Sequence, residues 1–402
     1  MNGIVSKVRT VASEPTFGVL MALCSVHCFN DLLQSVVSAV YPMLKEDLSL
    51  SFGQIGLITL VYQIAASVFQ PVVGLAFDRR PFVGSLPMGM VFTSVGILLF
   101  AFAGSLPAVL LAVFLVGVGS STLHPEASRI TSLASGGRRG MAQSIFQVGG
   151  NFGTSIGPLL VAAMVAPHGR TYIAWFIIVA AMAFYAMRPI CRWYSGWLAQ
   201  TAARGAAQAI RKKAPLSHGR TVWVISILTV LIFSKYIYMA SITNYYTFYL
   251  IHRFGVSISA SQVCLFVFLV ATAAGTLVGG PLGDRYGRQP VIWISILGTA
   301  PFSLALPHCG LYATVAMSFC AGFMLSSAFP AILLYSQELL PNKLGLVSGL
   351  FFGFSFGVAG VASAVLGEFA DTYGIDAIFS FCAYMPLIGI VAALLPNLRR
   401  LS

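Results

Sequence analysis

Two charged residues, Asp31 and Lys235, each stand in the middle of a long apolar segment. A charge inside a transmembrane helix is costly, so such residues are rare and usually functional. A carboxylate in this position can take up and release a proton, and an ammonium group can attract an anion. We therefore expect both side chains to reach a shared water-filled cavity halfway through a membrane.

The segment around Asp31 has a polar face. At about 100° per residue its polar side chains fall within a sector of about 120°. They are Cys24, His27, Asn30, Asp31, Gln34, Ser38 and Tyr41. His27 and Asp31 are four residues apart and can share a proton or a hydrogen bond. Asp31 is the leading candidate for a proton carrier, with His27 as its partner, and Asn30 and Gln34 are candidates for substrate contact. The alternative is a structural His–Asp hydrogen bond.

Lys235 has its own polar neighbours on one helical face. Four tyrosines share its sector and offer hydroxyls and ring faces to a substrate. They are Tyr238, Tyr245, Tyr246 and Tyr249. We predict that Lys235 and these tyrosines contact an anionic substrate. The alternative is a salt bridge between Asp31 and Lys235 that touches no substrate.

Further polar residues lie inside apolar segments. His124 and Glu126 flank a proline, and Glu126 is three residues before Arg129. We predict a gate or structural ion pair for Glu126 and Arg129. Substrate contact and proton transfer through His124 or Glu126 are the alternatives. The glutamine and asparagine candidates for substrate binding are Gln63, Gln143, Gln147 and Asn151.

The composition places all these residues in a membrane protein. The 402 residues are 58% hydrophobic and 8% charged, whereas soluble proteins average about 25% charged residues. Continuous apolar runs of about 20 residues predict membrane-spanning helices rather than a barrel. The expected spans are 17–41, 52–77, 85–103, 107–130, 140–165, 172–190, 221–250, 259–280, 289–306, 311–335, 344–366 and 375–396.

The distribution of basic residues predicts the orientation. With both termini in the cytoplasm, 19 of the 23 Lys and Arg residues lie on the cytoplasmic side, as the positive-inside rule expects. The net charge of +12 therefore reflects topology and does not indicate nucleic-acid binding. Residues 191–220 are basic and form the expected cytoplasmic linker, for which anionic lipid headgroups are the expected partner.

The two halves of the chain repeat one motif. Gly74 to Arg79 and Gly280 to Arg285 both read G-x-x-x-D-R, at an offset of 206 residues. We predict an N-terminal six-helix bundle over 1–190 and a C-terminal one over 221–402. Because both motifs fall on the same side of the membrane, the halves are parallel repeats.

These motifs, with Tyr286-Gly287-Arg288 after the second, resemble the loop signature of the major facilitator superfamily. The runs Ser25 to Ser35, His124 to Arg129 and Gln143 to Gly153 look like those of bacterial fosmidomycin resistance proteins. The resemblance implies an inner-membrane efflux pump that exchanges protons for a small drug by alternating access. Fosmidomycin is a phosphonate, so the implied cargo is anionic.

The resemblance also implies a gating role for loops between the halves. In this superfamily such loops latch the halves together, and the role carries over to Gly74, Asp78, Arg79, Gly280, Asp284, Arg285 and Arg288. One departure concerns the fourth span, where many drug–proton antiporters carry an arginine. Val113 occupies that place here, so another ionisable group must carry the proton.

Other classes of function are less well supported. The sequence holds no metal-spaced cluster, P-loop lysine or serine elbow, so we expect neither an enzyme nor a bound metal or organic cofactor. Protons are the expected coupling ion, and we expect a monomer. An importer of a small anion or sugar on the same all-α fold is the main alternative, and a membrane sensor is a more distant one.

Overall fold

The computed structural model describes residues 16–203, 216–340 and 344–396, and this part of the chain folds into helices. The first half contains α1 to α8 and the second half α9 to α16. Their bounds are α1 Phe17–Ala39, α2 Tyr41–Leu48, α3 Phe52–Arg79, α4 Ser85–Phe102, α5 Leu106–Leu133, α6 Arg139–Leu160, α7 Ala166–His168, α8 Ile177–Ala203, α9 His218–Phe254, α10 Ile258–Tyr286, α11 Arg288–Leu297, α12 Ala300–Ala305, α13 Leu311–Ser326, α14 Ala328–Leu339, α15 Leu344–Tyr373 and α16 Ile375–Cys382.

Short helices of other types extend some of these elements. A π-helical turn, Val161–Val165, follows α6, and 3₁₀ segments occupy Arg170–Phe176, Leu306–His308 and Met385–Leu394. The described residues then form 12 stretches that are long and apolar enough to cross a membrane. The prediction of twelve spans is confirmed.

The ends of the helices follow from local chemistry. Ser51 caps α3 by accepting a hydrogen bond from the backbone N–H of Gln54, whose side chain accepts one from the N–H of Ser51. This reciprocal capping box satisfies donors that the first turn leaves without partners. Gly255 ends α9 with φ of 65°, a left-handed conformation that a residue without Cβ adopts at little cost.

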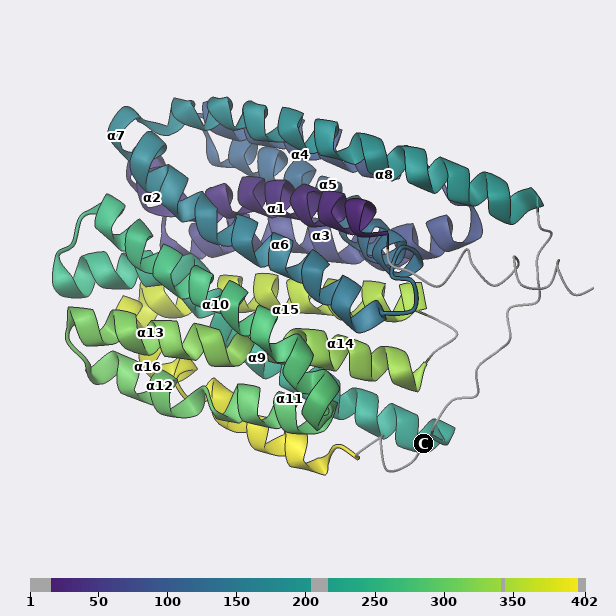
Figure 1. Ribbon diagram of the computed structural model, residues 1–402. Helices are drawn as coiled ribbons and strands as arrows, with labels where there is room; N and C mark the ends of the chain where they lie inside the picture. The colour runs from purple at the N-terminus through teal and green to yellow at the C-terminus, as the bar shows by residue number, and fades with distance from the viewer. Residues whose placement is uncertain (1–15, 204–215, 341–343, 397–402) are drawn as a thin grey trace, which may run out of the picture.

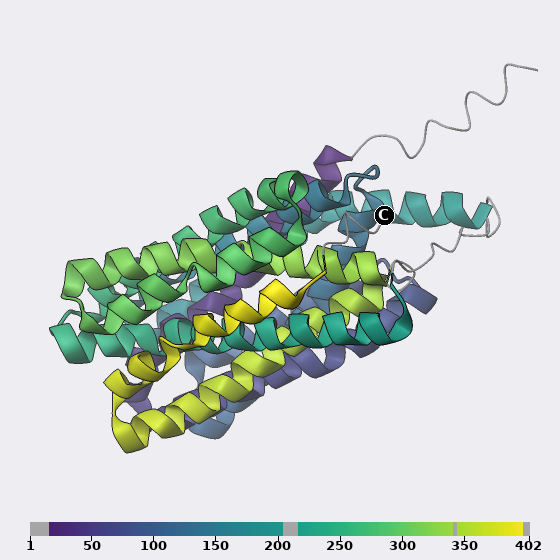
Figure 2. The ribbon, with the colours of Figure 1, turned by 90° about the horizontal axis from the view of Figure 1, so that it is seen from below.

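The two halves lie side by side, with α1 to α8 in the upper part of Figure 1 and α9 to α16 in the lower part. The contacts between them are dominated by two helix pairs, α3 with α15 and α6 with α10. Figure 2 gives the same arrangement from below. We call the end at which α1 begins and α15 begins the terminal end, and the end that holds α2 and α7 the far end.

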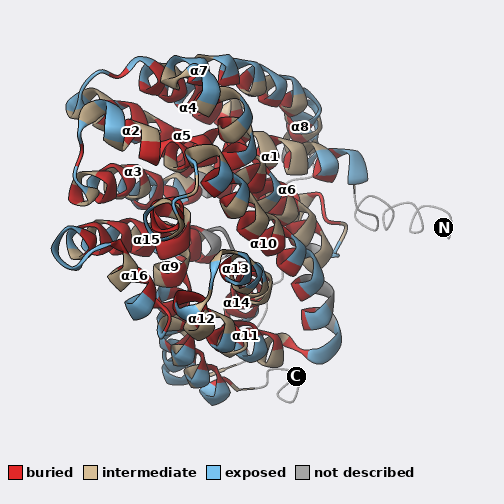
Figure 3. Ribbon diagram, turned by 90° about the vertical axis from the view of Figure 1, so that its left-hand side faces the viewer, coloured by how far each residue is buried: buried red, intermediate tan, exposed pale blue. Residues whose placement is uncertain are grey.

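Burial follows the position of each face relative to the bundle. Figure 3 shows buried residues where helices face one another and exposed residues on the outer surface. Many of the exposed outer residues are large and apolar, for example Val72, Phe102 and Ile390, each more than 60% exposed. An apolar outer surface of this extent is expected of a protein that lies in lipid.

Some predicted boundaries need correction. Helix α8 continues to Ala203, so residues 191–203 prolong the sixth span instead of forming a separate linker segment, and 204–215 lie outside the described residues. The G-x-x-x-D-R motifs also lie within the last turns of α3 and α10 rather than in loops. The backbone of both motifs is therefore helical.

Candidate functional site

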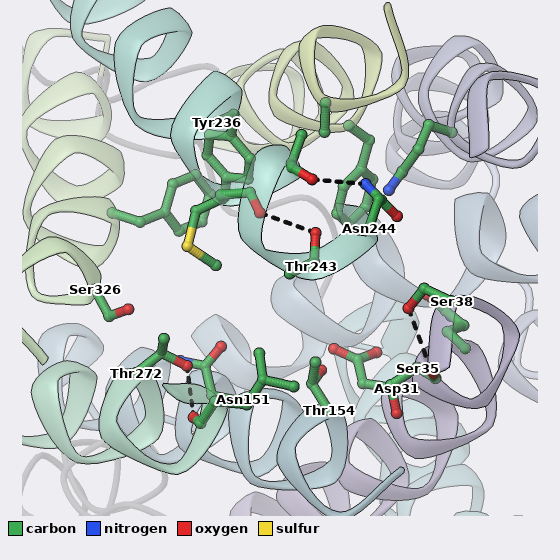
Figure 4. Close-up of a pocket in the computed structure, with 18 of the residues that line it drawn as sticks. Asp31, Ser35, Ser38, Asn151, Thr154, Tyr236, Thr243, Asn244, Thr272 and Ser326 are labelled. Carbon is green, nitrogen blue, oxygen red and sulfur yellow. Dashed lines mark hydrogen bonds between the residues drawn. The ribbon is translucent and has the colours of Figure 1, made fainter. Parts of the chain in front are cut away.

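A cavity of about 230 Å³ lies between the two halves. In Figure 4, Asp31, Ser35 and Ser38 of α1 lie across the cavity from Tyr236, Thr243 and Asn244 of α9. Helices α6 and α10 contribute Asn151, Thr154 and Thr272 to the same view. Both Asp31 and Lys235 line this cavity, as the sequence analysis expected of two charges near the same depth.

Asp31 lies between two histidines. His27 Nε2 is 3.1 Å from Asp31 Oδ2, and His124 Nε2 is 3.4 Å from Asp31 Oδ1. The amide of Asn30 donates a further hydrogen bond to Asp31 Oδ1 at 2.9 Å. Both imidazoles are buried, whereas Asp31 keeps about a sixth of its side chain exposed, at 17%. We call His27, Asp31 and His124 the histidine–aspartate cluster.

Backbone carbonyl groups fix which ring nitrogen of His27 and of His124 faces Asp31. His27 Nδ1 is 2.7 Å from the carbonyl oxygen of Phe146, which can only accept, so this nitrogen carries a hydrogen. A neutral His27 would then turn a lone pair toward Asp31, and the contact at 3.1 Å requires a proton between them. His124 Nδ1 contacts the Ser120 carbonyl at 3.0 Å and the Ser120 hydroxyl at 3.1 Å. The carbonyl can only accept, so Nδ1 of His124 also carries a hydrogen, and the contact of Nε2 with Asp31 at 3.4 Å likewise requires a proton between them.

The cluster is also the place where a metal ion would find ligands. One ligand atom from each of the three residues lies within 4.8 Å of the others. Two imidazoles and a carboxylate form a donor set that divalent transition metals use. The same donor set, opened toward a cavity, is suited to exchanging protons.

Lys235 is held differently. It is 5% exposed, and its ammonium lies 5.5 Å from the centre of the Tyr236 ring and 5.3 Å from that of Phe329. Aromatic faces attract cations through their quadrupole. Among the residues that the structure describes, no carboxylate forms an ion pair with Lys235, so the salt bridge to Asp31 is not present in this structure.

Three amide side chains offer unused hydrogen-bonding groups beside the charges. Gln34 Nε2, Gln63 Oε1 and Gln147 Oε1 are buried without a partner in the described part of the chain, and all three residues line the cavity. The other polar atom of the Gln34 amide, its oxygen, accepts a hydrogen bond from the Tyr62 hydroxyl. Buried polar atoms without partners are rare in folded proteins, so these groups are suited to a polar ligand.

Asn151 lines the cavity but already has a partner. Its amide nitrogen donates to the hydroxyl of Thr276 at 2.6 Å, which joins α6 of one half to α10 of the other. A residue predicted for substrate contact therefore also holds the halves together. Polar lining residues that sequence reasoning missed include Ser35, Tyr62, Tyr236, Thr243, Asn244, Thr272, Thr276 and Ser326.

The four predicted tyrosines do not line the cavity, so this expectation is wrong for the present structure. Tyr245 donates to the carbonyl of Ser363 at 2.5 Å, and Tyr246 donates to Ser318 at 3.3 Å. Tyr238 and Tyr249 are buried inside the second half. Helix α9 instead presents Tyr236, Met239 and Thr243 to the cavity. The face of α9 that lines the cavity therefore lies about a quarter turn around the helix axis from the predicted face.

Three further candidates are also buried away from the cavity. Asn30 supports Asp31, as described above, and Gln143 accepts a hydrogen bond from Ser128 at 3.2 Å. Glu126 forms a two-pronged ion pair with Arg129, at 2.9 and 2.7 Å, and Arg129 also donates to Tyr194. The predicted Glu126–Arg129 ion pair is therefore present, whereas Glu126 has no place in the cavity.

The predicted gating residues are described only in part. Arg288 lies 3.4 Å from Glu338 of its own half, and Arg285 stacks over Tyr286 with 5.2 Å between the charge and the ring centre. Gly74 is buried in the last turns of α3. The side chains of Asp78, Arg79 and Asp284, and position 280, lie outside the described residues.

The far end of the interface between the halves is closed by polar bonds. Asp371, at the end of α15, accepts hydrogen bonds from the backbone N–H groups of Phe52 and Gly53 at 2.9 and 2.7 Å. These N–H groups begin α3, so a carboxylate of one half caps a helix of the other. Gln262 of α10 also donates to the carbonyl of Ala39 at 2.7 Å.

Glycines allow the same two helices to approach each other closely. A Cβ on Gly56 would lie 2.6 Å from the carbonyl oxygen of Ser363, and one on Gly367 would lie 2.5 Å from that of Phe52. Nearer the terminal end, a Cβ on Gly349 or Gly357 would meet its nearest neighbour at 3.4 or 3.6 Å. The interface is therefore tight at the far end and looser toward the terminal end, although Gly353 between them is close, at 2.9 Å.

The sequence and the fold both resemble those of known proteins. Residues 23–265 and 230–401 match the family model described as the Major Facilitator Superfamily. The chain belongs to the major facilitator superfamily. It is 52% identical over 390 residues to the fosmidomycin resistance protein of Escherichia coli (strain K12), covering 97% of this chain and 95% of that protein. It is 39% identical over 400 residues to the uncharacterized MFS-type transporter YfnC of Bacillus subtilis (strain 168), covering 98% and 97%.

Solved structures of this superfamily share the fold. The transporter FucP in its outward conformation matches with a TM-score of 0.65 at 16% identity, over 94% of this chain and 98% of that one. A bacterial homolog of the human lysosomal transporter Spinster, inward-facing and occupied, matches with a TM-score of 0.69 at 16% identity, over 94% and 95%. The superfamily membership makes this chain a multi-pass membrane transporter rather than an enzyme.

Proposed function

We propose that this transporter exports a small anionic compound of the fosmidomycin type across the bacterial inner membrane in exchange for protons. The observation that supports it most is the pair of unlike charged groups in one cavity. Asp31 is bound to two histidines, whereas Lys235 lies against two ring faces. The first arrangement suits a group that gains and loses a proton, and the second suits a cation that waits for an anionic partner.

The names of relatives support an anionic cargo. The chain is 52% identical to a fosmidomycin resistance protein over nearly its whole length, and fosmidomycin carries a phosphonate. More distant partial relatives, each 29% identical, are a 4-hydroxybenzoate transporter over 45% of this chain and a hexuronate transporter over 42%. Both printed substrates carry a carboxylate. A single ammonium group among aromatic rings is suited to recognising all three anions.

Access to the cavity would alternate between the two ends of the bundle. The bias of basic residues favours a cytoplasmic location for the terminal end, and the basic segment around α8 would then face anionic headgroups. A monomer suffices for this cycle because one chain carries both halves. The membrane potential supplies about 2.3 kcal/mol per 100 mV for each elementary charge, and it would drive both the entry of a proton and the exit of an anion.

The proposal is tested with purified protein in liposomes under an imposed pH gradient. The wild-type protein should move fosmidomycin against its own gradient. The Asp31→Asn variant should lose uphill transport because the amide cannot exchange a proton. Uphill transport that survives this substitution would remove protons on Asp31 from the mechanism.

The anion site has a separate test. Lys235→Ala should weaken fosmidomycin binding by about 10-fold to 100-fold, because a charged hydrogen-bonding partner is worth about 1.5–3 kcal/mol. Unchanged affinity would show that Lys235 does not bind the drug. Cells that lose the gene should also become more sensitive to fosmidomycin. Loss of growth on an anion or sugar, without drug sensitivity, would favour the importer.

A further inference from the structure

The histidine–aspartate cluster has the dimensions of a metal-ion site. His27 Nε2 and His124 Nε2 lie 3.1 and 3.4 Å from the two oxygens of Asp31. Ligand atoms around a tetrahedral zinc ion, each about 2.0–2.1 Å from the metal, are about 3.3–3.4 Å apart. One ligand atom of each residue also lies within 4.8 Å of the other two. A small movement of the rings therefore lets one ion contact all three side chains.

Backbone carbonyls orient both imidazoles as ligands. Nδ1 of His27 donates to the carbonyl of Phe146 at 2.7 Å, and Nδ1 of His124 donates to that of Ser120 at 3.0 Å. In a neutral ring the lone pair is then on Nε2, which faces Asp31 in both cases. Metal-binding histidines almost always donate their other ring nitrogen to a carbonyl, a carboxylate or water in this way. The two rings are therefore held as metal ligands require.

Gly150 of α6 leaves space beside the ligand atoms. A Cβ at this position would lie 2.5 Å from His27 Nε2 and 2.7 Å from Asp31 Oδ2, so any other residue would fill the place between these two atoms. The walls of this space are fixed by packing. The ring of His27 stacks on that of Phe146 at 4.0 Å, and the amide of Asn30 donates to Asp31 Oδ1 at 2.9 Å. Ligands that helices and supporting hydrogen bonds hold in this way are well positioned for an ion.

The cluster opens toward the cavity. Both histidines are buried, whereas Asp31 is partly exposed, and all three residues line the cavity together with Lys235. The ring of His124 also packs against that of Phe356 at 5.4 Å between centroids. Three protein ligands leave at least one coordination position of a zinc-type ion for water or a small anion. This position would face the cavity, on the side from which an ion can enter.

We propose that His27, Asp31 and His124 bind a divalent transition-metal ion, such as Zn²⁺ or Co²⁺, with an open coordination position toward the cavity. Imidazole ligands favour such ions, whereas Mg²⁺ and Ca²⁺ prefer oxygen ligands alone. Spacing along the chain does not indicate this site, because His124 reaches α1 only through the packing of α5. The ion would use the same lone pairs as protons do, so the two are alternative occupants of the cluster. The proposal does not rest on the cargo or the direction of transport.

Cobalt binding to the full-length protein, purified in detergent without a histidine tag, tests the site. We expect one Co²⁺ per chain, with visible d–d absorption, displaced by Zn²⁺ and not by an excess of Mg²⁺. Zn²⁺ should also raise the midpoint of thermal unfolding, because the ligands are assembled only in the folded protein. Absence of Co²⁺ absorption would overturn the proposal. So would a strong charge-transfer band in the near ultraviolet, since it would assign the ion to a thiolate such as Cys24 or Cys28.

Variants separate the cluster from other histidines. Asp31→Asn and His124→Gln each remove a ligand, so Co²⁺ affinity should fall at least as far as the roughly 10- to 100-fold that loss of a supporting group costs. Gly150→Ala keeps all three ligands but fills the space between them, and it should weaken binding as strongly. His252→Ala is the matched control, because His252 is 66% exposed and lies 3.4 Å from the carboxylate of Asp376. Its affinity should equal that of the wild-type protein, and equal affinity in all four variants would place the ion elsewhere.

Two further measurements complete the test. Thermal unfolding without metal identifies the variants that fold, and His27→Gln replaces His124→Gln if the latter does not. Azide, a small anion that coordinates metals, should shift the visible absorption of the Co²⁺-loaded protein. An unchanged spectrum at saturating azide would contradict the open coordination position.

Discussion

The two ends of the interface between the halves are held together in different ways. At the far end, Asp371 caps the start of α3, Gln262 binds Ala39, and glycines bring α3 against α15. Around the cavity, the described contacts between the halves include the ring contacts of His124, the bond from Asn151 to Thr276 and the bond from Thr59 to the amide oxygen of Asn244. Backbone and charged groups join the halves at the far end, whereas these contacts around the cavity are made by side chains.

This difference indicates which end has to rearrange least for the cavity to open. Hydrogen bonds between a carboxylate and backbone N–H groups are stronger than neutral ones, and the glycine contacts leave no room for adjustment. Side-chain rotations suffice to separate the groups that join the halves around the cavity. The structure therefore represents a state closed at the far end.

The largest loss of transport is expected from a substitution at the closest contact between α3 and α15 at the far end. In Gly56→Ala, the new Cβ would lie 2.6 Å from the Ser363 oxygen and 2.8 Å from Ala364 Cα, both backbone atoms. Overpacking of this kind typically costs about 1–3 kcal/mol, so closure and fosmidomycin transport in liposomes should fall by about tenfold or more.

Gly349→Ala is the matched control for that prediction. Gly349 lies in the same helix pair, and its new Cβ would sit 3.4 Å from Pro71, an ordinary contact. Its transport rate should stay close to that of the wild-type protein. Equal losses in the two variants would contradict the difference in packing between the ends.

A smaller effect is expected from Asp371→Asn. The amide keeps one acceptor, so either the Phe52 or the Gly53 N–H loses its bond, and the charge that favours a helix N-terminus is lost as well. The loss of one hydrogen bond costs about 0.5–1.5 kcal/mol, so the far end should open about two- to tenfold more often. The measurement is the rate at which a membrane-impermeant maleimide, added at the far end, labels a cysteine introduced by Thr243→Cys, a position that lines the cavity.

Asp376→Asn is the control for this labelling. Asp376 also lies at the far end, but its carboxylate contacts His252 of its own half at 3.4 Å. The labelling rate should not change. A faster rate in both variants would mean that the general loss of negative charge, and not the cap on α3, controls opening.

The smallest effect is expected from Asn151→Ala. It removes one neutral hydrogen bond between the halves, worth about 0.5–1.5 kcal/mol. The Thr276 hydroxyl still donates to the carbonyl of Thr272. Labelling of the same Thr243→Cys position should increase a few-fold from the terminal end and remain unchanged from the far end. An increase from the far end would show that this bond belongs to the tight closure.

The sequence predicted features that depend on one helix at a time. The face of α1 that carries His27, Asp31 and Gln34 lines the cavity, because the spacing along a single helix fixes which side chains share a side. The Glu126–Arg129 pair was predictable for the same reason. For α9, the face toward the cavity depends on how neighbouring helices rotate it, so Lys235 was found while Tyr238, Tyr245, Tyr246 and Tyr249 were assigned to the wrong side.

By itself, the sequence determined the number of spans, the parallel repeat and the burial of two opposite charges, because lipid penalises polar groups along each helix separately. Only the tertiary structure decided that Asp31 pairs with His124 rather than Lys235 and that Asp371 caps a helix 318 residues away. These contacts depend on the distances between helices. The packing of the two six-helix halves sets those distances, and a local pattern of residues cannot predict them.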